Sequence, residues 1–334
     1  MSAAPAIPLS ATRLVGIAKL AAESVTLEAK RVVQYSEIEC RSVLNRAGGQ
    51  MPFRWSINPY RGCEFACRYC YARYTHEFME LRDSRDFEDR IFAKARVGPI
   101  LRRELGKIDG RDGIAIGTAT DPYQPAERRF RRTREILEVF AMARGVDLTI
   151  TTKSDLVTPD IDLLQQIAVH NRVGVNITIT TVDATLARLL EPRAPHPDLR
   201  LRAVRKLADA GIPVGVFPNP IMPLITDQED RLDKLAAAAK AHGAMWLAGG
   251  VLFLMPSAQR VFFPFLQLHY PHLLRRYQER FESDAYLRGP YRDTIRERLQ
   301  RIRQRHGLAA SDTRPAQNQD SSQAVLFPEA AQLA

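Results

Sequence analysis

The chain has 334 residues, of which 45% are hydrophobic, and a formal net charge of +10. This composition is sufficient for one large core with extensions, and no apolar run reaches the roughly 18 residues of a membrane-spanning helix. The first residues lack the basic segment and apolar stretch of a signal peptide, so we expect a cytoplasmic protein with no membrane partner. The positive charge suits anionic ligands such as nucleic acid, but an arginine-rich solvent-exposed surface explains it equally well.

Taken in chain order, residues 1–50 are expected to form an N-terminal extension, helical over 17–30 and otherwise irregular. From Arg54 onward, short apolar runs alternate with helical patterns, which is typical of repeated βα units. The expected strands are 55–58, 113–118, 147–152, 173–180, 213–219 and 244–254. The expected helices are 100–107, 131–143, 160–170, 183–190, 200–210 and 228–242.

Six βα units predict an α/β fold in which a parallel sheet curls into a partial (βα)6 TIM-like barrel, with an open doubly wound sheet as the alternative. Asp160 is expected to cap the helix that follows it, and Ala210-Gly211 to end another. We divide the chain into the N-terminal extension (1–50), a core (51–255), a helical C-terminal extension (256–308) and a disordered tail (309–334).

The C-terminal extension is rich in arginine. Residues 275–305 contain ten Arg and five Asp or Glu. Ile295, Leu299 and Ile302 recur at helical spacing, which predicts an amphipathic helix with these three side chains on its buried face.

Three of the four cysteines, Cys63, Cys67 and Cys70, lie within eight residues in the pattern C-x3-C-x2-C, just after the first expected strand. A secreted disulfide framework would spread its cysteines, so this spacing indicates a metal site. Thiolates are the ligands of iron–sulfur clusters, and three local ligands leave one iron of a cubane open. A closed tetrahedral zinc site completed by His76 is the alternative.

The cysteine triplet resembles the motif of the radical S-adenosylmethionine (SAM) superfamily. The similarity extends over residues 54–255 to the spore photoproduct lyase-related branch, through segments at successive strand ends: 58–63, 70–73, 117–127, 151–154, 190–193 and 220–227. The resemblance implies a [4Fe–4S] cluster with SAM at the open iron. It implies that SAM is cleaved to methionine and a 5′-deoxyadenosyl radical, which abstracts hydrogen from a substrate, and that a reductant such as flavodoxin or ferredoxin supplies the electron.

The same resemblance assigns cofactor roles at the strand ends. The residues expected to contact SAM are Tyr69, Thr118, Thr120, Asp121, Lys153, Ser154, Thr178, Thr180 and Arg193. The segment that contains Asp121 would take the SAM amino group, Lys153 its carboxylate, and the fourth-strand threonines its ribose. Each residue type has an ordinary alternative: an Asp-Pro turn, a surface lysine, strand threonines, and for Arg193 a structural ion pair with Glu191.

Tyr69 and Tyr71, which flank Cys70, are the catalytic candidates, because tyrosines are implicated in hydrogen transfer in spore photoproduct lyase. The chain departs from that enzyme in one respect. The hydrogen-donating cysteine of the enzyme lies downstream of the cluster motif, whereas here no cysteine follows Cys70 and Cys40 lies upstream. We therefore expect no efficient repair of spore photoproduct by the same mechanism.

A nucleic-acid substrate, in DNA repair or modification, is favoured by charge, by the branch resemblance and by the segment 323–327. In this segment Gln323, Leu326 and Phe327 resemble the short peptide with which bacterial proteins bind the sliding clamp. The basic run 128–134 could contact phosphates or could be the solvated start of a helix. The alternatives are a radical SAM enzyme that acts on a peptide or small molecule, and a non-catalytic iron–sulfur or zinc module.

Overall fold

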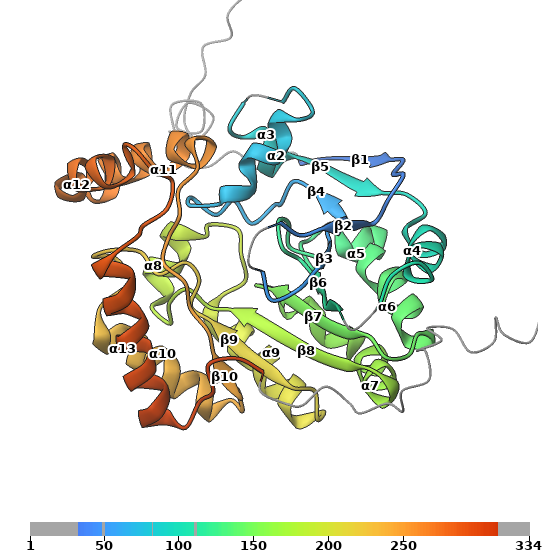
Figure 1. Cartoon of the computed structure of the whole chain (residues 1–334). Helices are drawn as coiled ribbons and strands as arrows, with labels where there is room; N and C mark the ends of the chain where they lie inside the picture. Colours follow the sequence, from blue (N-terminus) through green and yellow to red (C-terminus); the bar gives the residue numbers. More distant parts are fainter. Residues whose placement is uncertain (1–32, 49–50, 82, 110–111, 313–334) are drawn as a thin grey trace, which may run out of the picture. The chain divides into compact units, whose positions relative to one another are not determined.

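The computed structural model describes residues 33–48, 51–81, 83–109 and 112–312 (Figure 1). In this part of the chain the larger sheet has seven strands in the order β10-β9-β8-β7-β6-β3-β2. They are β2 (Leu44–Arg46), β3 (Trp55–Ile57), β6 (Ile114–Ile116), β7 (Asp147–Thr152), β8 (Arg172–Thr178), β9 (Val214–Phe217) and β10 (Trp246–Leu247). All neighbouring strands are parallel except β2 and β3, which are antiparallel.

The order of the parallel strands decides between the two predicted architectures. Strands β3, β6, β7, β8, β9 and β10 are neighbours in the order in which they occur along the chain. A doubly wound sheet would reverse its direction part-way and place helices on both faces. Here the connecting helices follow the outer face of the curled sheet (Figure 1), so the fold is the partial (βα)6 barrel that the sequence predicts.

The six helices that the sequence predicts between these strands are present, with ends that differ by a few residues. They are α4 (Val97–Leu105), α6 (Arg132–Met142), α7 (Ile161–His170), α8 (Ala184–Leu190), α9 (Pro197–Asp209) and α10 (Glu229–Ala241). Gly211, at φ +75°, follows the end of α9 as expected. The expectation for Asp160 was wrong: its carboxylate makes no cap bond, because it accepts from the Tyr123 hydroxyl and pairs with Arg134.

A second, three-stranded sheet was not predicted. It consists of β1 (Gln34–Ile38), β5 (Arg90–Lys94) and β4 (Tyr60–Arg61) in the order β1-β5-β4. Because β1 and β2 both lie within residues 1–50, the expectation that this extension is irregular outside its helix was wrong. Both strands are short and largely exposed, so they lack the apolar pattern of a buried strand. The helix expected over 17–30 lies outside the described residues.

Short helices complete the barrel region: the 3-10 turns Tyr71–Arg73 and Asp155–Asp160, α2 (Tyr74–Glu77), α3 (Asp86–Asp89) and α5 (Glu127–Phe130). The main apolar core fills the space between the large sheet and its helices. A separate buried cluster joins the cysteine region to the helices that follow β10. Within the described ranges, no helix is both long and apolar enough to cross a membrane.

The C-terminal extension contains three helices: α11 (Pro256–His269), α12 (Pro271–Phe281) and α13 (Pro290–His306). The single helix expected within 275–305 is interrupted, because Gly289 and Pro290 start a new helix. The three apolar side chains on α13 are buried as predicted. Residues 309–312, assigned from the sequence to a disordered tail, continue the structure: the N–H of Leu247 donates to the carbonyl of Ala309.

Candidate active site

The three clustered cysteines lie on the loop that connects β4 to the 3-10 turn Tyr71–Arg73. Cys63 and Cys67 are buried, and Cys70 is partly buried. The backbone N–H of Cys63 donates to the carbonyl of Phe87 at 2.8 Å. Gly62 has φ +79°, and a Cβ atom there would lie 2.8 Å from the carbonyl oxygen of Arg90, so the turn into the loop requires glycine.

The buried thiols lie close enough together to influence one another. Burial raises the pKa of Cys63 well above its usual value, and the nearby Asp121, Cys67 and Cys70 raise it further. Burial likewise raises the pKa of Cys67 to about 12. Thiols in this environment become thiolates when a positively charged metal centre offsets the charge, and this donor set fits the three-thiolate attachment of a [4Fe–4S] cluster.

His76, the fourth ligand of the alternative zinc site, is occupied elsewhere. Its Nε2 lies 3.0 Å from the carbonyl oxygen of Arg90, and its ring packs against Phe87 and Phe92. Among the described residues, no three His, Cys, Asp or Glu side chains form a group suited to a single metal ion, as a closed zinc site requires. The position of His76 therefore contradicts the zinc alternative.

The side chain of Asn58, at the end of β3, ties together two strand-end loops. Its Oδ1 accepts from the N–H groups of Ala119 and Thr120 at 2.8 and 3.2 Å, and its Nδ2 donates to the hydroxyl oxygen of Thr118 at 3.1 Å. The hydroxyl of Thr120 donates to the carbonyl of Tyr60. The two threonines predicted to contact SAM are thus held by the loop that leads to the cysteines.

Two residues of the segment 117–127 also hold the cysteine loop. The Gln124 side chain accepts from the N–H of Glu64 at 3.1 Å and donates to the carbonyl of Gly62 at 3.0 Å, so it brackets Cys63. The carboxylate of Glu127 accepts from the Tyr60 hydroxyl and from the N–H of Thr133. The sequence indicated this segment through its family resemblance, but not that its residues act on the loop backbone.

Asp121 is engaged by neighbouring strand ends. Its carboxylate accepts from the N–H of Tyr123 at 2.9 Å, from the Thr152 hydroxyl at 2.6 Å and from the N–H of Lys153 at 2.7 Å. These bonds match the structural turn that was the alternative to SAM binding. Ser154 is similarly committed, because its hydroxyl accepts from the N–H of Leu156 at the start of the next turn.

Glu191 is the centre of a buried polar network that the sequence did not reveal. Its carboxylate accepts from the hydroxyls of Tyr69 and Thr180 and forms a 2.6 Å ion pair with Arg200. Lys153 lies 4.0 Å away. Burial alone would raise the pKa of Glu191, but Arg200 and Lys153 outweigh it and lower the pKa. The network joins the residue before Cys70 to the ends of β7 and β8.

Lys153 lies on the cysteine side of this network. Its Nζ is 5.9 Å from the centre of the Tyr69 ring. Burial alone would lower the pKa of Lys153, but the negative charges of Cys67 and Glu191 raise it, so the lysine carries a positive charge beside the thiols. The alternative of a surface lysine is contradicted, because only 17% of the side chain is exposed.

The predicted pair between Arg193 and Glu191 does not form. Arg193 instead binds Asp89, with both terminal nitrogens 3.1 Å from Oδ1, and Glu191 pairs with Arg200. The prediction was wrong because Arg200, further along the chain on α9, reaches the buried carboxylate instead. Thr178 is buried at the end of β8, and its carbonyl accepts from Arg200.

Tyr71 lies between the cysteine loop and a large cleft. Its hydroxyl donates to the carbonyl of Thr118, and its ring packs 4.6 Å from the ring of Phe253. The cleft has a volume of about 720 Å³. It is lined by the ends of β3 and β6, by Tyr71 and α2, and by residues that follow β10. Of the two catalytic candidates, Tyr71 therefore faces a space for a ligand, whereas Tyr69 is buried in the Glu191 network.

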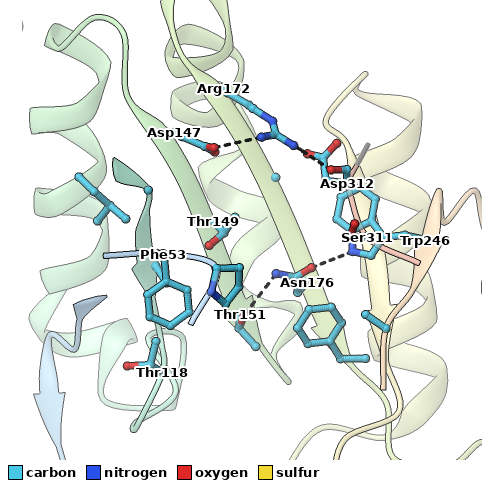
Figure 2. Close-up of a pocket in the computed structure, with 17 residues that line it drawn as sticks. Phe53, Thr118, Asp147, Thr149, Thr151, Arg172, Asn176, Trp246, Ser311 and Asp312 are labelled. Carbon is cyan, nitrogen blue, oxygen red and sulfur yellow. Dashed lines mark hydrogen bonds and ion pairs between the residues drawn. The ribbon is translucent and has the colours of Figure 1, made fainter. Parts of the chain in front are cut away.

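A second, smaller cavity of about 300 Å³ occupies the interior of the barrel (Figure 2). Asn176 lies across it, bonded to the Thr151 hydroxyl and to the Trp246 indole N–H. At the other end Arg172 pairs with Asp147 and Asp312. Thr118 lines both this cavity and the larger cleft, so the two spaces adjoin at the end of β6.

Residues 57–236 match the family model of the radical SAM superfamily. The chain belongs to the radical SAM superfamily. An uncharacterized protein of Mycobacterium tuberculosis is 35% identical over 304 residues, which cover 90% of this chain and 88% of that protein. An uncharacterized protein of Methanocaldococcus jannaschii is 31% identical over 176 residues, or 53% of this chain and 63% of the other.

Solved structures confirm the fold. A variant of spore photoproduct lyase has a TM-score of 0.61 at 16% identity, over 81% of this chain and 79% of the other. Another structure of that lyase, with bound AdoMet and dinucleoside spore photoproduct, has a TM-score of 0.59 at 14% identity over the same shares. The predicted resemblance to this superfamily and branch is confirmed.

Radical SAM enzymes use a [4Fe–4S] cluster and SAM, so both are cofactors of this protein. The three thiols of the cysteine loop are the donors that fit the cluster. The assignments of individual residues to SAM remain predictions; among them Lys153 has the most suitable charge and position, because it is a buried cation beside the cysteines.

Replacing Cys63, Cys67 or Cys70 by Ala should abolish cluster binding, because each removes one of three iron ligands. Wild-type protein reconstituted anaerobically should contain about four irons per chain, as measured by iron analysis and visible absorption. Cys40→Ala is the matched control and should retain the iron, because Cys40 lies away from the loop and its thiol contacts the carbonyl of Ala95. Tightly bound zinc without visible absorption would contradict the assignment.

Glu191→Gln should destabilise the folded protein by about 3–5 kcal/mol, because the change leaves the buried Arg200 without its counter-charge. Urea unfolding followed by circular dichroism measures this difference. Glu279→Gln is the control: its side chain is 58% exposed in a surface pair with Arg275, so it should change the free energy of unfolding by less than about 1 kcal/mol. Equal unfolding curves for Glu191→Gln and wild type would show that the network contributes nothing measurable.

Proposed function

We propose that this radical SAM enzyme abstracts a hydrogen atom from a nucleic-acid substrate bound in the cleft beside Tyr71. The observation that carries the proposal is the position of this cleft, which reaches the cysteine loop at the residue after Cys70. The structure of spore photoproduct lyase with a bound dinucleoside supports the substrate class, and the net charge of +10 agrees with it.

When bound, the cluster supplies the electron that cleaves SAM to methionine and a 5′-deoxyadenosyl radical, and the radical takes a hydrogen atom from the substrate. The chain's own residues position the reactants. Cys63, Cys67 and Cys70 hold the cluster, and the buried ammonium of Lys153 pairs with the SAM carboxylate. The Glu191 network fixes Lys153 and Tyr69 in place before SAM arrives.

Tyr71 contributes the wall between the cluster loop and the substrate. Burial raises the pKa of its hydroxyl well above the usual value, so the side chain stays protonated at neutral pH. Its hydroxyl donates to the carbonyl of Thr118, which fixes the ring against Phe253. A protonated, fixed phenol beside the cleft suits the hydrogen-transfer role predicted for it.

Radical SAM enzymes require an external reductant, and a flavodoxin or ferredoxin is proposed for this one. The sliding-clamp peptide at Gln323, Leu326 and Phe327 lies outside the described residues and stays a prediction. A peptide or small-molecule substrate remains the rival to nucleic acid, and deuterium transfer from labelled substrates separates the two.

With dithionite as reductant, the reconstituted wild type should convert SAM to 5′-deoxyadenosine and methionine at a slow rate without substrate. Lys153→Ala should weaken SAM binding by about tenfold or more, since it removes a buried charge-assisted contact. Its iron content should remain close to that of wild type. The exposed Lys206→Ala serves as the control. Equal SAM affinity in Lys153→Ala and wild type, measured by equilibrium dialysis, would remove Lys153 from the cofactor site.

Deuterium should pass into 5′-deoxyadenosine when the enzyme acts on its substrate, because the radical takes an atom from it. We expect this transfer, detected by mass spectrometry, with deuterated oligonucleotides from a panel of damaged and modified nucleic acids. We expect no efficient turnover of spore photoproduct, because no cysteine follows Cys70. Transfer from deuterated peptides alone would contradict a nucleic-acid substrate, and clean repair of spore photoproduct by Cys40→Ala would contradict the inference from the missing cysteine.

A further inference from the structure

Two basic residues, Arg61 and Lys94, line the cleft from the small sheet. Arg61 lies opposite Phe92 in the antiparallel pair of β4 and β5, and Lys94 is two residues beyond Phe92 on the same strand. Because side chains on a strand alternate between faces, Arg61 and Lys94 lie on the same face of this sheet. The opposite face, with Tyr60 and Ala93, is buried in a small apolar cluster.

Lys94 is an unusual lysine, because it is only 6% exposed and yet forms no ion pair within the described ranges. In the same part of the chain, no side-chain hydrogen bond joins its ammonium, or the guanidinium of Arg61, to another residue. The carboxylate of Glu104, a nearby negative charge, accepts from the N–H groups of Val43 and Leu44. Burying an ammonium without a partner is costly, so this arrangement suits an anion supplied by a ligand.

The opposite side of the cleft is aromatic. The rings of Phe253 and Tyr286 stack at 5.3 Å, and Phe253 also packs against Tyr71. Near α2, Tyr74 meets Phe78 edge-to-face at 5.7 Å. Phe78 is 75% exposed and Tyr286 is 51% exposed, so both present ring surface to a ligand. Large exposed aromatic rings beside a cleft are the features on which nucleobases stack.

We propose that Arg61 and Lys94 form a phosphate subsite in this cleft, and that Phe78 and Tyr286 stack on the bases of the same strand. This inference rests on the proposed function and names its substrate more closely. A cleft of about 720 Å³ is the size of a small-molecule site and accommodates unstacked nucleotides rather than a duplex. The substrate is therefore single-stranded nucleic acid, or a nucleotide turned out of its helix.

A fluorescein-labelled single-stranded DNA of ten nucleotides tests the subsite by anisotropy with the reconstituted holoprotein. The double variant Arg61→Gln, Lys94→Gln should bind at least about tenfold more weakly. The slope of log affinity against log salt should become shallower by about 0.7 for each phosphate that the variant no longer neutralises. Phe78→Leu with Tyr286→Leu should weaken binding and leave the salt slope unchanged, because stacking releases no counterions. Lys206→Gln, an exposed lysine on α9, is the matched control.

A second variant separates binding from folding. Lys94→Met should also weaken DNA binding, yet its urea midpoint should equal or exceed that of wild type, because the change removes an uncompensated buried charge. A lowered midpoint together with wild-type DNA affinity would show a structural lysine and overturn the inference. Equal losses of SAM and DNA affinity in the double variant would assign the anion site to SAM and likewise overturn it.

The outcomes also separate this inference from the proposed function. If the wild type transfers deuterium from an oligonucleotide but the double variant binds DNA normally, the substrate class stands and the subsite falls. If the wild type binds no nucleic acid and takes deuterium from peptides, the proposed function falls and the subsite falls with it.

Discussion

The structure depends on one requirement: three thiols from an eight-residue loop must be held close together inside the protein without help from regular secondary structure. Hydrogen bonds from buried side chains meet this requirement. Gln124 bonds the backbone on both sides of Cys63, and Asn58 ties the preceding strand end to the loop after β6. Tyr69, anchored on Glu191, fixes the loop on its other side. Such partly charged networks stabilise a single arrangement because leaving any member unpaired is costly.

The sequence predicted the parts of the fold that follow from local pattern. Buried parallel strands are apolar and separated by helices, so the order of six βα units was readable, as was the cysteine spacing that marks the cluster. The small sheet was missed because β1 is mostly exposed and is stabilised by backbone pairing with β5. Asp160 shows a further limit: the residue stands at a helix start, but a tyrosine on a distant loop takes its carboxylate.

The candidate site was predictable to the same extent. Ligands within one loop could be recognised, whereas partners from different strand ends could not. The partner of Glu191 is Arg200 on α9 rather than the adjacent Arg193, because a helix turns its side chains toward the barrel wall at positions that only the packing determines. Lys94 is a comparable case: in sequence it is an ordinary basic residue, and only the curvature of the small sheet brings it to a cleft.

The end of the described chain has a practical consequence for handling the protein. Ala309 pairs alongside β10, and Asp312 binds Arg172 at the start of β8, so this segment closes the amino-terminal end of the barrel. The cysteine loop and the cleft lie where the strands finish, at the opposite end. A surface tether or affinity handle joined through the residues after Asp312 leaves from the closed end. Immobilisation by that route would orient the open end, with its oxygen-sensitive centre, toward the surrounding solution.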